Sequence, residues 1–313
     1  MGLHKYMIDK FCDFLVKMDG DRMATQPKYE GLEKWENIPY IDDGNECHLL
    51  DVYRPEGTEG PLPVIVDVHG GAWFYGRKEI NAQFCHAMAK KGFVVVNISY
   101  RTIREEDGGR FPAIAEDIFA AYNWTYEHIA EYGGDLNNAF LIGDSAGVHL
   151  AGLTMQINGD EKTSERLGLS TKINFRALGW ICGVSTVDNF KKLHIPVLNY
   201  VFTLFFGKGW KKSENYALAN IRARDLSTLP PIFMNSAYAD FMKKDVIEFD
   251  EILTEAGHEH EFVYITEEEQ AKDYGSNEHK LDHCYNVHYP EWPECDMVNE
   301  RMAKFFFDRM AKE

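Results

Sequence analysis

The stretch Gly143-Asp144-Ser145-Ala146-Gly147 decides how this chain folds, because it joins a strand to a helix through an abrupt turn. It follows the apolar run 139–142 and opens the small-residue run 148–153, a pattern typical of a strand followed by a packed helix. A serine in so tight a turn is lifted off the backbone, and side chains two residues before and after it would collide. The helix that follows directs free N–H groups and the positive end of its dipole towards Ser145. The pattern Gly-x-Ser-x-Gly therefore indicates a nucleophilic serine.

A second glycine-bearing turn lies upstream of the first. The run 63–68 reads as a buried strand and leads directly into His69-Gly70-Gly71-Ala72-Trp73. Two such turns in this order, each after a strand, are typical of sites in which the first turn supplies backbone N–H donors to an oxyanion and the second carries the nucleophile. We expect the N–H groups of Gly71, Ala72 and Ala146 to form this oxyanion hole, and His69 to orient the loop.

Together the two turns resemble those of the hormone-sensitive-lipase-like branch of the α/β-hydrolases, which are carboxylesterases. Further blocks support the resemblance: Ser99-Tyr100-Arg101, then Phe111-Pro112-Ala113 and Glu116-Asp117. It covers roughly residues 36–313 and is tightest over 63–153. One position departs from the family pattern, since Ala72 stands where the family has a third glycine. Alanine keeps the backbone N–H but narrows the freedom of the loop.

Composition limits the class of protein. The 313 residues are enough for one large α/β domain with a modest cap, and 45% are hydrophobic, enough for a full core. The net charge of −17 argues against nucleic acids and anionic membranes as partners. The N-terminal residues lack an uninterrupted apolar run, so we expect no signal peptide and no membrane span. Six scattered cysteines without metal-ligand spacing fit the reduced cytoplasm.

The order of elements predicts a doubly wound, mostly parallel α/β sheet. Residues 35–54 indicate two antiparallel strands, and the later segments alternate between apolar strand and helix. The predicted strands are 63–68, 93–98, 138–142, 175–184, 231–237 and 260–265, and the predicted helices are 79–91, 112–132, 242–256 and 296–310. The run 267–269, three glutamates, is expected to be a solvated loop. Active sites in such sheets lie at the carboxyl ends of the strands, where both glycine-bearing turns occur.

Two segments are expected to cover the site. Residues 1–35 carry apolar side chains at helical spacing, and the resemblance implies that this helix caps the α/β-hydrolase domain of residues 36–313. Residues 185–228, rich in aromatic side chains, form the expected lid insertion. Trp73, Phe205 and Phe206 are the candidates for substrate contact; the alternative is that the lid aromatics only pack on the core.

A serine nucleophile needs a base and an orienting carboxylate, which in this fold follow in the order Ser, acid, His. Asp240 comes directly after the strand 231–237 and is the expected acid, with Asp245 and Asp188 as rivals. His283 lies between the last strand and the final helix and is the expected base. His288 is second choice, and His279 lies in the same loop.

These residues predict a serine carboxylesterase that acts on short-chain acyl or acetyl esters of small molecules, without a metal or organic cofactor. Two alternatives keep the same site: an amide or formamide hydrolase, and an acetyl or feruloyl esterase for plant-derived oligosaccharides. A third is a binding protein built on a hydrolase scaffold that has lost its activity. The oligomeric state is open, with a homodimer as one expectation.

Overall fold

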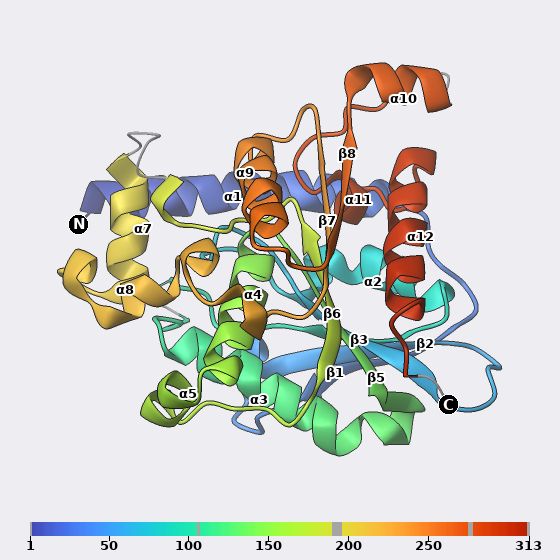
Figure 1. The fold of residues 1–313 in the computed structure, drawn as a ribbon, viewed down its shortest axis with the longest axis horizontal. Helices are drawn as coiled ribbons and strands as arrows, with labels where there is room; N and C mark the ends of the chain where they lie inside the picture. Colours follow the sequence, from blue (N-terminus) through green and yellow to red (C-terminus); the bar gives the residue numbers. More distant parts are fainter. Residues whose placement is uncertain (1, 105–106, 190–195, 275–277, 312–313) are drawn as a thin grey trace.

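The computed structural model describes residues 2–104, 107–189, 196–274 and 278–311. Its centre is an eight-stranded sheet of order β1-β2-β4-β3-β5-β6-β7-β8 (Figure 1). The strands are β1 (Leu32–Pro39), β2 (Leu49–Pro55), β3 (Leu62–Val68), β4 (Val94–Ile98), β5 (Gly134–Asp144), β6 (Phe175–Ile181), β7 (Ile232–Ala237) and β8 (His260–Ile265). β2 runs antiparallel to β1 and to β4, and β3 to β8 are mutually parallel. The doubly wound, mostly parallel sheet that the sequence predicts is confirmed.

Helices cover both faces of this sheet. The long helices are α1 (Gly2–Thr25), α2 (Ala82–Lys90), α3 (Ala113–His128), α4 (Ala146–Gly159), α7 (Pro196–Phe206), α9 (Lys243–Glu255) and α12 (Pro293–Phe307). Shorter helices are α5 (Glu161–Leu167), α8 (Glu214–Leu218), α10 (Glu267–Tyr274) and α11 (Tyr285–His288). Apolar side chains of α3, α4 and α9 pack in one core cluster, and those of α2, α11 and α12 in another.

The two clusters form because successive side chains of a strand point to opposite faces. In β3, Val64 and Val66 belong to the first cluster and Ile65 to the second. In β5, Phe140 stacks on Phe306 of α12 with ring centroids 4.7 Å apart. Strands buried on both faces are apolar at nearly every position, as the sequence of these runs suggested.

The register of the two central strands places the glycine-bearing turns side by side. β3 and β5 are parallel neighbours, and Val68 pairs with Gly143. Both strands therefore leave the sheet at the same level. The glycine loop (residues 69–76) follows β3, and the serine turn (residues 143–147) ends β5.

One expectation about local structure is wrong. The glutamates at 267–269 begin α10 instead of a loop. Thr266 Oγ1 accepts a hydrogen bond from the Glu269 N–H at 3.1 Å, while Glu269 Oε2 accepts from the Thr266 N–H at 2.9 Å. This reciprocal capping box satisfies the free donors of the first helical turn, and acidic side chains are favourable there.

Candidate active site

The serine turn holds its serine in a strained conformation. Ser145 has φ 51° and ψ −120°, outside the regions that non-glycine residues normally occupy. Its N–H donates to the carbonyl of Ile181 at 2.9 Å, which fixes the turn to β6. A Cβ on Gly143 would lie 2.6 Å from the Val148 nitrogen, and one on Gly147 would run into the carbonyls of Val68 and His69. Both glycines are therefore needed for the turn to close.

Ser145, His283 and Asp240 lie in one chain of hydrogen bonds. Ser145 Oγ is 2.8 Å from His283 Nε2, and His283 Nδ1 is 2.7 Å from Asp240 Oδ1. A carboxylate only accepts, so Nδ1 carries the proton and Nε2 is free to accept from the serine hydroxyl. The structure brings these three residues together from the end of β5, the loop after β7 and the segment before α11.

Asp240 is almost fully buried and well supplied with donors. Its Oδ2 accepts from Ser236 Oγ at 2.7 Å, and its Oδ1 also accepts from the Met242 N–H at 2.8 Å. Burial by itself would raise the pKa of Asp240, but the hydrogen bonds from His283, Ser236 and Met242 and the attraction to the His283 ring outweigh it. The pKa of Asp240 is therefore lowered, and the carboxylate stays ionised.

The glycine loop is folded by three consecutive residues in the left-handed region: Gly71 (φ 111°), Ala72 (φ 50°) and Trp73 (φ 65°). The N–H groups of Phe74 and Tyr75 donate back to the Gly71 carbonyl at 3.1 and 2.9 Å. A Cβ on Gly71 would collide with the Tyr75 carbonyl, so glycine is required there. At Ala72 the small Cβ is accepted in the left-handed conformation.

Asp144 connects the serine turn to the glycine loop. Its Oδ1 accepts from the Gly70 N–H at 2.9 Å and from Asn81 Nδ2 at 2.8 Å. Asn81 Nδ2 also donates to Asp67 Oδ2 at 3.0 Å, so one amide bridges two buried carboxyl groups. Burial, followed by the charge of Asp144, raises the pKa of Asp67 to about 8. Burial also raises the pKa of Asp144.

His69 supports the glycine loop and is not placed to act as a base. Its ring stacks on Tyr100 with centroids 4.2 Å apart, and its Nδ1 lies 2.7 Å from the Gly70 carbonyl. The Tyr100 hydroxyl donates to the His69 carbonyl at 2.5 Å. His69 is fully buried, and burial lowers its pKa to about 4, so the ring is neutral.

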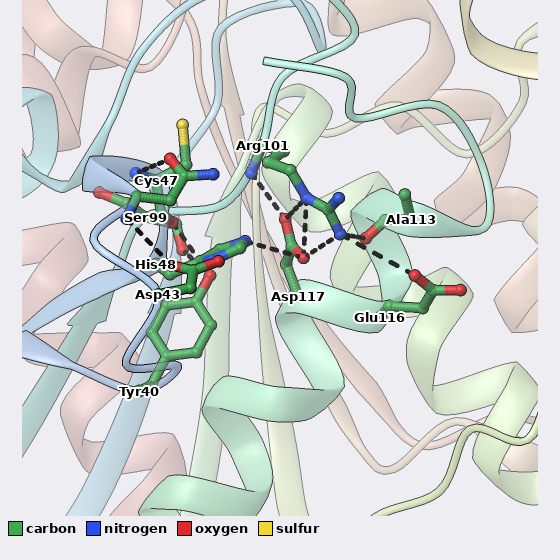
Figure 2. Close-up of polar contacts among 10 residues, drawn as sticks. Tyr40, Asp43, Cys47, His48, Ser99, Arg101, Ala113, Glu116 and Asp117 are labelled. Atoms are coloured by element: carbon green, nitrogen blue, oxygen red, sulfur yellow. Dashed lines mark hydrogen bonds and ion pairs between the residues drawn. The ribbon is translucent and has the colours of Figure 1, made fainter.

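The rest of the Ser99-Tyr100-Arg101 block is fixed by the polar cluster of Figure 2. Arg101 donates twice to the Asp117 carboxylate of α3, from Nε to Oδ2 at 2.8 Å and from Nη2 to Oδ1 at 2.6 Å. His48 lies between Asp117 and Asp43, with ring nitrogens 3.3 and 2.8 Å from their carboxylates (Figure 2). The cluster joins the segment before β2, the segment after β4 and α3, and so anchors Tyr100 beneath His69.

The rival acids and bases have other partners. Asp245 accepts from the N–H and Oγ of Ser185, both at 2.7 Å, and Asp188 accepts from the Tyr216 hydroxyl. Burial lowers the pKa of His288 well below its ordinary value, and its carbonyl accepts from Arg22 and Gln26. His279 stacks on Trp292 and lies 3.3 Å from Glu294.

The aromatic candidates for substrate contact lie in a packed cluster. Trp73 has ring contacts with Phe202 and Phe205 of α7, at 6.3 and 6.2 Å between centroids. Phe205 and Phe206 both contact Phe111. Trp73 and Phe205 are 3% and 2% exposed, so their packing on the core is extensive. Residues 190–195 of the expected lid, 185–228, lie outside the described part of the chain.

Helix α1 contacts the glycine loop and the segment after His283. Its Asp19 accepts from the Tyr75 hydroxyl at 2.8 Å and pairs with Arg22 at 3.0 Å. Arg22 in turn donates to the carbonyls of Ile80 and His288 at 3.1 and 3.3 Å. In Figure 1 the helix extends from the side of α7 to the side of α11.

Sequence reasoning missed four residues at the site: Phe241, His149, Asn81 and Ser236. Phe241 is 72% exposed, yet its ring centroid is 4.2 Å from that of His283. His149 and Trp73 are in hydrogen-bond contact at 3.3 Å. Asn81 donates to the carboxylates of Asp67 and Asp144, which are distant in sequence. Ser236 donates to Asp240, which follows a turn. For Ser236 alone a local signal exists, its position four residues before Asp240.

In the described part of the chain, one group of side chains has the composition and proximity of a metal site. The group is Cys182, His283 and Cys284, with ligand atoms within 4.8 Å of one another. Both thiols are buried, and both ring nitrogens of His283 already contact Ser145 and Asp240.

Comparison with known proteins matches this fold and site to a family. Residues 50–224 match the family model described as BD-FAE. The chain belongs to this family. The match runs from β2 to residue 224, within the expected lid insertion, and therefore includes both the glycine loop and the serine turn.

Curated relatives of this BD-FAE family member carry esterase names. Carboxylesterase NlhH of Mycobacterium tuberculosis (strain CDC 1551 / Oshkosh) is 29% identical over 273 residues, 81% of this chain and 82% of that protein. A probable isoprenylcysteine alpha-carbonyl methylesterase of Arabidopsis thaliana is 35% identical over 106 residues, 34% of this chain. That second alignment spans only 22% of the Arabidopsis protein.

Solved structures share the whole fold. Esterase B from Lactobacillus rhamnosis, in a crystal structure with a tributyrin phosphonate, superposes with a TM-score of 0.88 over 99% of this chain and 96% of that one, at 21% identity. A truncated carbohydrate esterase from gut microbiota gives a TM-score of 0.71 over 92% of this chain. The fold is that of the α/β-hydrolases. None of the described helices is long and apolar enough to cross a bilayer.

Proposed function

We propose that this chain is a serine carboxylic-ester hydrolase that acts on short-chain acyl or acetyl esters of small molecules. The observation that supports it most directly is the continuous hydrogen bonding from Ser145 through His283 to Asp240, at 2.8 and 2.7 Å. The esterase names of the BD-FAE family's relatives, NlhH among them, agree with this activity.

The reaction is an acyl transfer in two halves. His283 Nε2 takes the proton of Ser145 Oγ as the oxygen attacks the ester carbonyl, and Asp240 stabilises the resulting imidazolium. The N–H groups of Gly71, Ala72 and Ala146 are assigned to the oxyanion. His283 then protonates the leaving alcohol. In the second half it activates water, which releases the acid from the acyl-enzyme. One oxyanion donor is typically worth about 2.7–4 kcal/mol of barrier.

The substrate contacts belong to the same proposal. We assign the wall of the acyl pocket to Trp73, Phe205 and Phe206, which lie in one aromatic cluster between the glycine loop and α7. Helix α1 caps the site through its contacts with the glycine loop. The cysteines are all free and buried, which agrees with a cytoplasmic enzyme. A homodimer would be detected by light scattering coupled to size-exclusion chromatography.

The test is Ser145→Ala on p-nitrophenyl acetate and butyrate. If the three residues act as a unit, turnover should fall by a factor on the order of 10⁶, and a fluorophosphonate probe should label the wild type but not the variant. Unchanged turnover in the variant would reject the proposal. Parallel assays on arylamides, formamides and feruloylated oligosaccharides separate the ester activity from the alternatives on the same site.

A further inference from the structure

A fully buried histidine outside the proposed triad connects three parts of the site. His149 lies in the first turns of α4, four residues after Ser145, and has no exposed surface. Its ring meets Trp73 of the glycine loop edge to face, with centroids 5.4 Å apart and planes at 85°. Its second neighbour is the strap (residues 219–223), which follows α8 within the expected lid insertion, on the way to β7.

The hydrogen bonds of His149 determine its tautomer. Trp73 Nε1 lies 3.3 Å from His149 Nδ1, and an indole N–H can only donate, so Nδ1 accepts. The proton is then on Nε2, which donates to the Ala219 carbonyl at 2.9 Å. Burial lowers the pKa of His149 to about 4, which keeps the ring neutral and preserves this donor–acceptor arrangement. Both ring nitrogens are thus used, one towards the glycine loop and one towards the strap.

Trp73 is joined through the backbone to the residues whose N–H groups are the proposed oxyanion donors. Trp73 follows Gly71 and Ala72, and all three have positive φ. A left-handed conformation at two consecutive non-glycine residues costs energy and persists only where surrounding contacts enforce it. On the backbone side, the Trp73 carbonyl accepts from the Ile103 N–H at 2.8 Å. The Trp73 side chain is held by the hydrogen bond from its indole N–H to His149.

We propose that His149 is a positioning residue, which holds the glycine loop against the helix of the nucleophile. The proposal rests on the proposed esterase function. It assigns His149 no contact with substrate and no proton transfer. Its effect is exerted on the direction of the Gly71 and Ala72 N–H groups, so its loss lowers the rate of the chemical step more than it weakens substrate binding.

Substitutions at the two partners separate the contacts. Trp73→Phe keeps a ring and removes the indole donor, which leaves His149 Nδ1 without that partner. His149→Gln retains a terminal amide donor near the former Nε2 position and loses the Nδ1 acceptor. Because the two variants remove the same contact, the double variant should lose little more activity than either single one. The matched control is Gln156→Met on the same helix, since Gln156 donates to the strap at Ile221, at 3.0 Å, without contacting the glycine loop.

The decisive measurement compares an ester with its thionoester, in which sulfur replaces the carbonyl oxygen. Oxyanion-hole donors act better on oxygen than on sulfur, so the oxo-to-thiono ratio of kcat reports their alignment. We expect Trp73→Phe and His149→Gln to lower kcat on the oxo ester by about ten- to a hundredfold, less than complete removal of a donor. In His149→Gln, which has no contact with substrate in this proposal, KM should stay within about twofold, as expected when transition-state contacts alone weaken. In both variants the oxo-to-thiono ratio should fall by about threefold or more. Active sites are counted with a fluorophosphonate, so misfolded protein does not enter the rates.

The outcomes are distinguishable. A ratio that stays at the wild-type value in Trp73→Phe, the milder variant, would overturn the role of His149 while leaving the esterase proposal intact. That role would equally be overturned if Gln156→Met lowered the ratio as much. Absence of ester turnover by the wild type would reject the proposed function instead.

Discussion

At the scale of single residues, the exposed ring of Phe241 is the feature with the clearest consequence for specificity. It lies against the imidazole of His283, the group that we propose protonates the leaving alcohol, and it is largely open to solvent. An apolar leaving group beside His283 would bury part of this ring. Phe241→Ala should therefore lower kcat/KM by about five- to twentyfold for phenyl esters, since a buried aromatic contact is worth about 1–2 kcal/mol.

The effect should be selective for the alcohol part. Methyl esters of the same acids, which cannot reach the ring, should change by less than about twofold, a few tenths of a kcal/mol. Tyr126→Ala, an exposed aromatic on α3 remote from the site, is the matched control. An equal loss for phenyl and methyl esters would contradict contact with the leaving group.

Ser236 makes a prediction about the pH dependence. It donates to Asp240 Oδ2 and helps to lower the pKa of that carboxyl. Without this bond, the pKa of Asp240 should rise, so the protonated and inactive form should persist to higher pH. Ser236→Ala should lower kcat by about three- to tenfold, as expected when a hydrogen bond with a net worth of about 1 kcal/mol is lost, and shift the acidic loss of activity upward in pH.

The control for Ser236 is Ser227→Ala, which removes a similar serine–aspartate hydrogen bond, 2.7 Å long, on the surface. It should leave the pH profile of kcat in place. A Ser236→Ala profile that superposes on the wild type would mean that the remaining donors to Asp240 are sufficient.

At the scale of elements, the strands were easier to predict than the short helices. Runs such as 93–98 and 231–237 are short and apolar at nearly every position, which indicates a strand buried on both faces. The observed strands β4 and β7 lie within one residue of the expected bounds. Helix α10 was missed because its signal is local and polar: a threonine followed three residues later by a glutamate. Composition alone cannot distinguish such a capped helix from a solvated loop.

Helix α1 offers a test of the proposed cap and of how it is attached. The Tyr75 hydroxyl donates to Asp19, which forms a polar contact between α1 and the glycine loop. Tyr75→Phe should weaken this attachment by about 1.5–3 kcal/mol, the usual value of a hydrogen bond to a charged group. Amide hydrogen exchange within residues 2–25 should become faster, while exchange in β3 to β7 stays unchanged.

A matched Tyr126→Phe variant on α3 should alter neither region. Faster exchange throughout the sheet in Tyr75→Phe would indicate a general loss of stability, and would contradict a role confined to the cap.

For the molecule as a whole, the buried carboxyl of Asp67 makes stability depend on pH. Its pKa is about 8 in the folded state, against about 3.9 for an aspartate in an unfolded chain. Between these values the Asp67 carboxyl is protonated in the folded state and ionised in the unfolded state, so its contribution to the free energy of unfolding falls as pH rises from about 4 to about 8. Asp67→Asn keeps an acceptor for Asn81 and removes the titration.

Asp67→Asn should therefore be more stable than the wild type at pH 8, and the difference should shrink towards pH 5. Urea unfolding at several pH values measures this directly. A constant difference across the range would show that Asp67 does not titrate in it.

Which site residues can be predicted from the sequence depends on what determines the position of each one. The candidates for the triad could be proposed because each lies directly after a strand or before the last helix, where the order of elements determines the edge of the sheet. The partners of His149, Asn81 and Phe241 depend on side-chain packing between segments that are 14 to 76 residues apart. Nothing in local spacing encodes those contacts, so they required the structure.

The pairing of Val68 with Gly143 has a consequence for how such a protein can change. This pairing fixes the register of β3 against β5. Adding a single residue to either strand would turn every downstream side chain to the opposite face and separate the glycine loop from the serine turn. The lengths of β3 and β5 are thus frozen together. The segment between β6 and β7 lies outside this constraint, and insertions there, away from the strap that contacts His149, can alter what the enzyme accepts without disturbing the catalytic residues.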